Sequence, residues 1–139
     1  MDRKEFLTTV GIGAVAAICT SCLAACKPLD NPTSPPTNLD FTLNLADPAN
    51  SALKTNGGYI YKDNIIVARI SDGSYVALSS VCTHQGGTVA YEIGANRFHC
   101  PNHGSNFATD GSVINGPAGS PLVTYKTSLL DATSLRVFS

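Results

Sequence analysis

The sequence predicts an all-β fold: a small domain of stacked antiparallel sheets. Three observations lead to this prediction. Beyond Asp30, Gly and Pro are frequent, and the apolar segments are short and rich in Val, Ile, Leu and Tyr. Several segments alternate apolar and polar residues, which is the period of a half-buried strand. No segment after Leu39 shows a sustained helical period. The chain of 139 residues is long enough for one such domain but not for two.

The expected strands follow one another closely and are separated by turn signals. Lys62-Asp63-Asn64 is typical of a hairpin turn between two strands, and Asp72-Gly73 and Asp110-Gly111 are two further turn signals. Antiparallel strands joined in this way leave loops at the sheet ends that can carry function. The expected strands cover residues 41–45, 59–61, 65–70, 75–78, 88–92, 97–99, 112–114, 122–125 and 135–138.

The first 25 residues are typical of a secretory signal. Arg3 and Lys4 form a positive start, and the stretch from Leu7 to Ala25 is apolar or small. Its end, Leu23-Ala24-Ala25-Cys26, resembles the lipobox of bacterial lipoproteins, which implies cleavage before Cys26 and acylation of Cys26 as the first mature residue. An uncleaved transmembrane anchor and a secreted soluble form are the alternatives, since the apolar run is about the minimum length that spans a bilayer.

Residues 26–38 form a second expected region, with Pro28, Pro32, Pro35 and Pro36 among Asn, Ser and Thr. A segment of this composition builds no core and stays extended, so we interpret it as a tether. It would join the membrane anchor to a folded domain over residues 39–139. The lipoprotein and the uncleaved anchor both predict a membrane-attached domain outside the cytoplasm.

Charge gives no reason to expect a nucleic-acid partner. The formal net charge is −1 and no long basic or acidic run occurs, whereas phosphate binding needs clustered cations. The sequence also shows no nucleophile, acid–base pair or nucleotide-binding loop of an enzyme. We therefore expect no catalytic residues and no small-molecule substrate in this chain.

Two short segments combine cysteine with histidine: Cys82-Thr83-His84 and Cys100-Pro101-Asn102-His103, with fifteen residues between His84 and Cys100. Each offers one thiolate and one imidazole. A Cys2His2 zinc site would accept the same donors, although zinc sites usually place two Cys in one arm and two His in the other. A Cys82–Cys100 disulfide with bystander histidines is a further alternative. The pattern C-x-H with C-x-x-H at this separation resembles the Rieske iron–sulfur domain, over roughly residues 39–139.

The resemblance implies one 2Fe-2S cluster per chain, held by Cys82, His84, Cys100 and His103. In Rieske centres two histidines replace two cysteines on one iron. Two facing loops would thus supply both thiolates to one iron and both imidazoles to the other. Glycines let such loops turn sharply, and loop amides can then hydrogen-bond the sulfides. The glycines at these loops are Gly86, Gly87 and Gly104, and the segment 116–121, which includes Pro117, resembles the proline-rich loop that covers the cluster.

Four positions are informative when compared with the quinol-oxidising members of that family: three depart from them and one matches. Gly87 and Asn102 stand where those members carry a second cysteine pair, so the disulfide between the loops cannot form here. Ser105 matches a serine whose hydroxyl points at a bridging sulfide. Phe107 replaces a tyrosine that bonds a cysteine sulfur, and a phenyl ring has no such donor. Rieske potentials span about −150 to +300 mV, and we expect a value in the middle or lower part.

The predicted function is one-electron transfer to or from an extracytoplasmic redox protein or oxidoreductase subunit. Alternatives are a ferredoxin-like component that feeds an oxygenase, a small subunit of a quinol- or substrate-oxidising complex, and a structural zinc-binding module. A catalytic oxygenase is not expected, because it needs a mononuclear iron bound by two histidines and a carboxylate. Only His99 is left outside the expected ligand set.

Overall fold

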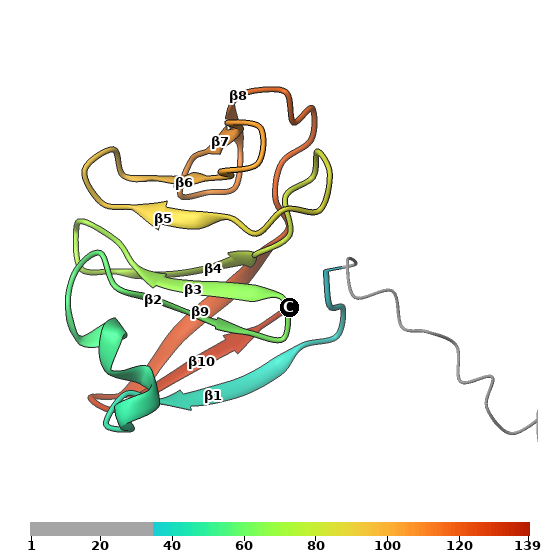
Figure 1. The fold of residues 1–139 in the computed structure, drawn as a ribbon. Helices are drawn as coiled ribbons and strands as arrows, with labels where there is room; N and C mark the ends of the chain where they lie inside the picture. The colour runs from blue at the N-terminus through green and yellow to red at the C-terminus, as the bar shows by residue number, and fades with distance from the viewer. Residues whose placement is uncertain (1–34) are drawn as a thin grey trace, which may run out of the picture. The chain divides into compact units, whose positions relative to one another are not determined.

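The computed structural model describes residues 35–139 (Figure 1). The expected signal segment, Cys26 and the first part of the expected tether lie outside the described residues. Of the elements between residues 35 and 139, no helix has the length and apolar character needed to span a membrane.

The larger of two antiparallel sheets has six strands in the order β1-β10-β9-β4-β3-β2. Strand β3, which lies next to the edge strand β2, is buried on both faces because every one of its first four residues is apolar. Ile66 and Ala68 face one core cluster, while Ile65 and Val67 face the other. Burial of one such side chain stabilises the fold by about 1.5–3 kcal/mol. The strands are β1 (Asp40–Asn44), β2 (Tyr59–Lys62), β3 (Ile65–Arg69), β4 (Tyr75–Ser79), β9 (Thr124–Asp131) and β10 (Ser134–Phe138).

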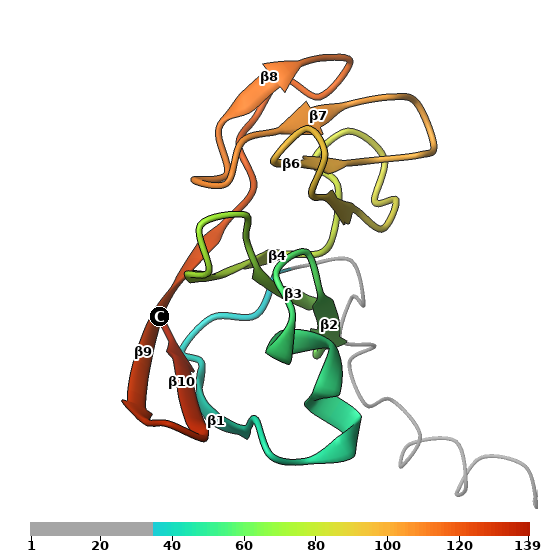
Figure 2. The same ribbon diagram turned by 90° about the vertical axis from the view of Figure 1, so that its left-hand side faces the viewer.

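The smaller sheet has four strands in sequence order, β5-β6-β7-β8, and lies over one end of the larger sheet (Figures 1 and 2). Its bounds are β5 (Ala90–Glu92), β6 (Arg97–His99), β7 (Asn106–Phe107) and β8 (Val113–Asn115). Phe98 and Phe107 are opposite each other across β6 and β7 and are fully buried. They share a core cluster with Ile66 and Leu78 of the larger sheet. The two stacked antiparallel sheets confirm the predicted fold class.

The turn signals are confirmed. Asp63 and Asn64 have φ of 50° and 63°, as a tight turn between β2 and β3 requires. Gly73 and Gly111 also have positive φ, and the N–H of each closes a turn.

Three elements differ from the sequence prediction, among them β9 (Thr124–Asp131), which begins and ends later than the expected strand over residues 122–125. The strand β7 was not predicted, because two residues are too few to show a period. A 3-10 helix, η1 (Pro48–Lys54), was also not predicted; its seven residues start at Pro48, and the side chain of Asp47 caps the N–H of Ala49. Such a short helix follows from its cap and its proline rather than from apolar spacing.

The end of the expected tether is bonded to the domain. The hydroxyl of Tyr125 donates to the carbonyl of Pro36 over 2.8 Å, and the N–H of Leu39 donates to Ser139 Oγ over 3.0 Å. Of the expected tether, Pro36 is therefore hydrogen-bonded to β9, while Leu39, the first residue of the expected domain, is bonded to Ser139 directly after β10.

Candidate metal centre

The two Cys/His loops share one backbone hydrogen-bond pattern. In each, the cysteine N–H donates to the carbonyl five residues later, over 2.7 Å from Cys82 and 2.8 Å from Cys100. In each, the cysteine carbonyl accepts from the glycine N–H four residues later, over 3.0 Å at both Gly86 and Gly104. These glycines have φ of 72° and 81°, where side chains are disfavoured. The same local turn therefore presents each Cys/His pair.

The loops place thiols inward and imidazoles outward. Cys82 and Cys100 are only 3% and 2% exposed and are not joined by a disulfide. His84 is half-buried and His103 is exposed. Burial, more than any other cause, raises the pKa of the Cys82 thiol, and the neighbouring Cys100 adds to this. Two buried thiols thus lie side by side beneath two histidines.

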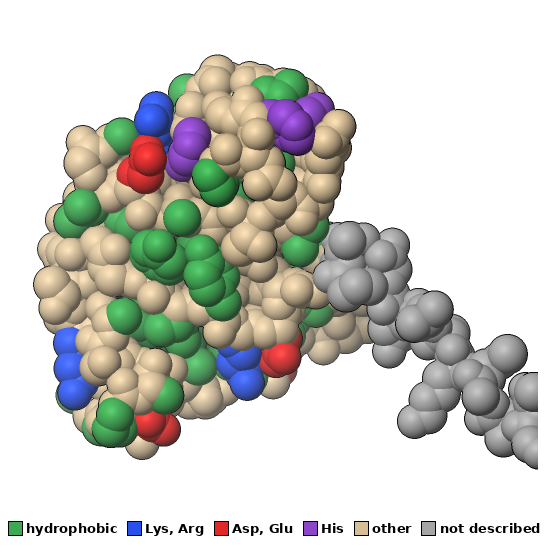
Figure 3. All heavy atoms as spheres, viewed as in Figure 1, with side chains coloured by type: hydrophobic (Ala, Val, Ile, Leu, Met, Phe, Trp, Pro, Cys, Tyr) green, Lys and Arg blue, Asp and Glu red, His purple; other side chains and the backbone are tan. Residues whose placement is uncertain are grey.

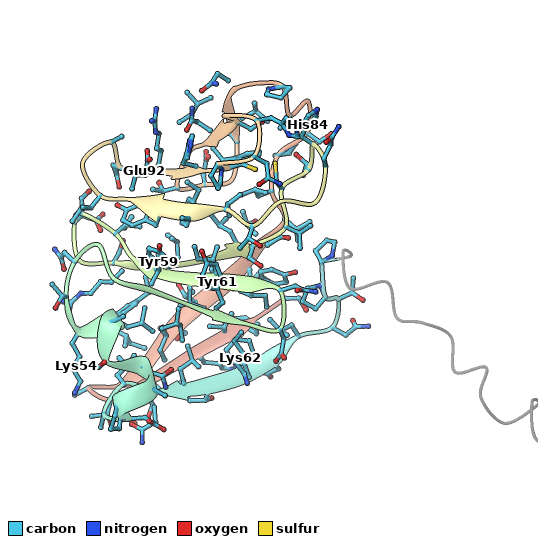
Figure 4. All side chains as sticks on the ribbon, in the orientation of Figure 1. Lys54, Tyr59, Tyr61, Lys62, His84 and Glu92 are labelled. Carbon is cyan, nitrogen blue, oxygen red and sulfur yellow. The ribbon has the colours of Figure 1, made fainter. Side chains whose placement is uncertain are left out.

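The two imidazoles lie together at one end of the domain. The ring centres of His84 and His103 are 4.8 Å apart and the rings are nearly perpendicular. Histidine atoms gather at two places on the face in Figure 3. The group at the upper right corresponds to the place where Figure 4 labels His84. His99, outside the expected ligand set, is half-buried, and its Nδ1 lies 2.8 Å from Asn106 Oδ1.

The donor set fits a two-iron cluster better than either alternative. Among residues 35–139, no three His, Cys, Asp or Glu side chains converge as a single metal ion would require. A structural zinc ion needs four donors that converge on one point, whereas a 2Fe-2S cluster takes two donors at each of its two irons. The free thiols exclude the Cys82–Cys100 disulfide. The Nδ1 atom of His84 is buried without a hydrogen-bond partner, which is unfavourable for a polar atom unless it binds a further group such as a metal.

A third loop, residues 116–121, contacts both Cys/His loops. Ser105 is fully buried, and its Oγ accepts from the N–H of Ala118 over 3.0 Å. The hydroxyl of Thr83 donates to the carbonyl of Ser120 over 2.6 Å. The Ser105 hydroxyl accepts in this bond, so its own proton can point at another acceptor. Pro117 itself is exposed. The loop's expected role as a cover for the cluster stays a prediction.

Gly87 and Asn102 lie in contact, although neither can form a disulfide. A Cβ atom built on Gly87 would lie 2.5 Å from Asn102 Nδ2 and 3.1 Å from Cys100 Sγ. The Asn102 side chain therefore fills the space that a larger residue at position 87 would need. Phe107 is fully buried in the same core cluster as Cys82 and Cys100.

Sequence reasoning missed two residues of this region, Asn106 and Asn115. Their side chains hydrogen-bond the second Cys/His loop through the carbonyl of Gly104. Asn115 stands nine positions after Asn106, in a different strand. Only the pairing of β7 with β8 brings them together, and no residue pattern in the sequence predicts that pairing.

The profile of the Rieske [2Fe-2S] domain matches residues 46–126 of the chain. The iron-sulfur subunit of the cytochrome b6-f complex from Chlorobaculum tepidum is 34% identical over 136 residues, covering 94% of this chain and 72% of that protein. This chain belongs to the Rieske [2Fe-2S] family. A second relative, the same kind of subunit from Synechococcus sp. strain JA-2-3B'a(2-13), is 46% identical over 66 residues, which cover 48% of this chain and 35% of that subunit.

Solved structures show the same Rieske fold. The plasma-membrane Rieske protein PetC3 of Synechocystis PCC 6803 aligns with a TM-score of 0.56 and 27% identity over 71% of this chain and 99% of that one. The ferredoxin of carbazole 1,9a-dioxygenase from Nocardioides aromaticivorans aligns with a TM-score of 0.55 and 20% identity, over 74% of this chain and 98% of that one. As a Rieske protein, the chain binds a 2Fe-2S cluster and transfers single electrons.

Proposed function

We propose that Cys82, His84, Cys100 and His103 are the protein ligands of the cluster. The two buried cysteines supply thiolates, and the two histidines supply imidazole nitrogens, among them the unpartnered Nδ1 of His84. Two supporting features are the shared turn of both loops and the 4.8 Å separation of the imidazole rings. When bound, the cluster supplies one-electron chemistry.

We further propose that electrons leave through the histidine edges to a redox protein outside the cytoplasm. The observation that carries this proposal is the contrast in exposure. Cys82 and Cys100 are almost fully buried, whereas His103 is exposed and His84 partly so. A redox partner that docks at this surface therefore contacts the imidazole rings and not the cysteine thiolates. A relative in Chlorobaculum tepidum is a subunit of a cytochrome complex, which supports a protein partner of that redox class.

Histidine variants test the ligand assignment. His84→Ala and His103→Ala each remove one iron ligand, so both purified proteins should lose nearly all iron and acid-labile sulfide. His99→Asn is the matched control, because an asparagine amide nitrogen stands in place of the imidazole Nδ1 and can still donate to Asn106, and His99 lies outside the proposed ligand set. Circular dichroism checks that each variant retains its sheets. Full iron content in either alanine variant contradicts the assignment.

We also propose that the protein is held at the membrane through a lipid on Cys26, with residues 1–25 removed. The lipobox-like end of the apolar segment supports this proposal, as does the structural similarity to a plasma-membrane Rieske protein. Mass spectrometry of the protein extracted from membranes should find Cys26 acylated at the mature N-terminus. Cys26→Ser should leave the segment uncleaved. An intact, unacylated N-terminus in the wild type contradicts the proposal.

A further inference from the structure

Two asparagine side chains tie the second Cys/His loop to the covering loop. Asn106 Nδ2 donates to the carbonyl of Gly104 over 3.2 Å, and Asn115 Nδ2 donates to the same carbonyl over 3.1 Å. Asn115 Nδ2 also donates to the carbonyl of Gly116 over 3.1 Å. The two side chains meet where Asn106 Nδ2 donates to Asn115 Oδ1 over 2.6 Å. Loops 100–105 and 116–121 are thus joined through side-chain amides.

The direction of every bond in this network is fixed. A backbone carbonyl can only accept, so the amide nitrogens of Asn106 and Asn115 must face Gly104 and Gly116. Asn106 Oδ1 then faces His99, whose Nδ1 must be the donor. Both NH2 groups use both of their hydrogens, and the Gly104 carbonyl accepts two bonds. Asn106 is buried, where a fully satisfied network of this kind is rigid and a broken one is costly.

We propose that Asn106 and Asn115 are positioning residues that hold the His103 loop in its cluster-binding conformation. This rests on the proposed ligand set. We call these two side chains the asparagine clamp. The clamp ties the His103 loop to loop 116–121, in a protein whose two Cys/His loops have no disulfide between them, since Gly87 and Asn102 cannot form one. It acts on the residue directly after His103, where the backbone has a φ of 81°.

The clamp also sets the direction of a backbone N–H. The Gly104 carbonyl and the Ser105 N–H belong to one planar peptide and point in opposite directions. Two hydrogen bonds that fix the Gly104 carbonyl therefore also fix the direction of the Ser105 N–H. Amides near a cluster stabilise its reduced, more negative form. Loosening the clamp should thus lower the reduction potential as well as speed cluster loss.

Asn115→Ala is the test, because Asn115 is exposed and its loss removes two donors without adding charge. Iron release to a chelator should become about tenfold faster, the effect of roughly one net hydrogen bond in a rate. The midpoint potential from protein-film voltammetry should fall. Asn56→Ala is the matched control, since Asn56 is also exposed and also donates to a backbone carbonyl, that of Ser71, but lies in the larger-sheet region. It should release iron at the wild-type rate and keep the wild-type potential.

A second variant tests the same contacts with side-chain size preserved. Asn115→Asp would turn a carboxylate toward two carbonyls and should release iron at least as fast as Asn115→Ala. If Asn115→Ala and Asn115→Asp both match Asn56→Ala in release rate and potential, the clamp has no positioning role. A wild-type protein without iron and sulfide would instead overturn the ligand assignment, and the clamp's role with it. A loaded wild type with unaffected variants overturns the clamp alone.

Discussion

Ser105 and Phe107 follow the second Cys/His loop and give it opposite hydrogen-bonding properties. Ser105 is buried and bonded to Ala118, with its own proton free to reach another acceptor. Phe107 is equally buried but offers no donor. A donor to a cluster ligand stabilises the reduced state more than the oxidised one. One aromatic residue without a hydroxyl therefore places the expected potential below that of quinol-oxidising Rieske proteins.

Phe107→Tyr should raise the reduction potential. Position 107 matches the tyrosine that bonds a cysteine sulfur in quinol-oxidising members, so we expect the added hydroxyl to donate to such a sulfur. We expect a rise of about 60 mV, which is a tenfold change for a one-electron couple. Phe98→Tyr is the matched control, because Phe98 is the buried cross-strand partner of Phe107 and also gains a hydroxyl. Voltammetry that gives the same potential for Phe107→Tyr, Phe98→Tyr and wild type would reject this role for position 107.

The residues that a sequence reveals at this site are those whose chemistry is unusual. Cys82, His84, Cys100 and His103 stand out because thiols and imidazoles recur at a set spacing. Asn106 and Asn115 do not stand out, because asparagine is common in turns and only strand pairing brings these two together. Ligand candidates were thus predictable, whereas the residues that hold their loops were not.

At the scale of elements, the two Cys/His loops depend on contacts rather than on a covalent link. Gly87 and Asn102 lie close enough that a double variant, Gly87→Cys with Asn102→Cys, should form a disulfide. Closing a loop of about 15 residues stabilises a fold by about 3 kcal/mol in the chain-entropy model. Denaturant unfolding of oxidised and reduced double variant measures the gain. Asn102→Cys alone, treated with the same oxidant, is the control and should show none.

The contact between the sheets predicts a loss of stability at high pH. Tyr61 of β2 donates its hydroxyl proton to the carbonyl of Val89 over 2.8 Å, near the start of β5 (Figure 4). Partial burial, and to a lesser degree Tyr59, raise the pKa of Tyr61 to about 12. An unfolded tyrosine ionises near pH 10. The folded state therefore favours the neutral phenol, and this stabilisation is complete below about pH 10 and lost as pH rises toward about 12.

Tyr61→Phe should make unfolding less sensitive to alkali. The variant loses one hydrogen bond, so it should be less stable than wild type at neutral pH. Its stability should then fall less steeply between about pH 10 and about pH 12, because the ionising group is gone. Thermal unfolding across that range measures both effects. If the stability of variant and wild type falls equally with rising pH, the ionisation of Tyr61 does not contribute to the alkaline loss of stability.

At the scale of the whole molecule, the fold followed from patterns that short strands can carry. The alternation of apolar and polar residues predicted β1, and a continuous apolar run predicted β3. Turn residues predicted the hairpin between β2 and β3. The strand β7 and the helix η1 were missed because each is too short for any periodicity. Which strands pair was not predictable either. Strand β9 pairs with its sequence neighbour β10 on one side and with β4, which is distant in sequence, on the other. That pairing depends on how the core packs, not on a local sequence pattern.

The EPR spectrum of the reduced protein tests the central claim most directly: two mixed Cys/His loops hold one 2Fe-2S cluster, with both nitrogens on one iron. This ligation predicts a spectrum whose average g value lies below that of an all-cysteine 2Fe-2S cluster. An average g value of the all-cysteine kind would contradict the ligand set. A colourless protein that contains zinc in place of iron would contradict the cluster itself.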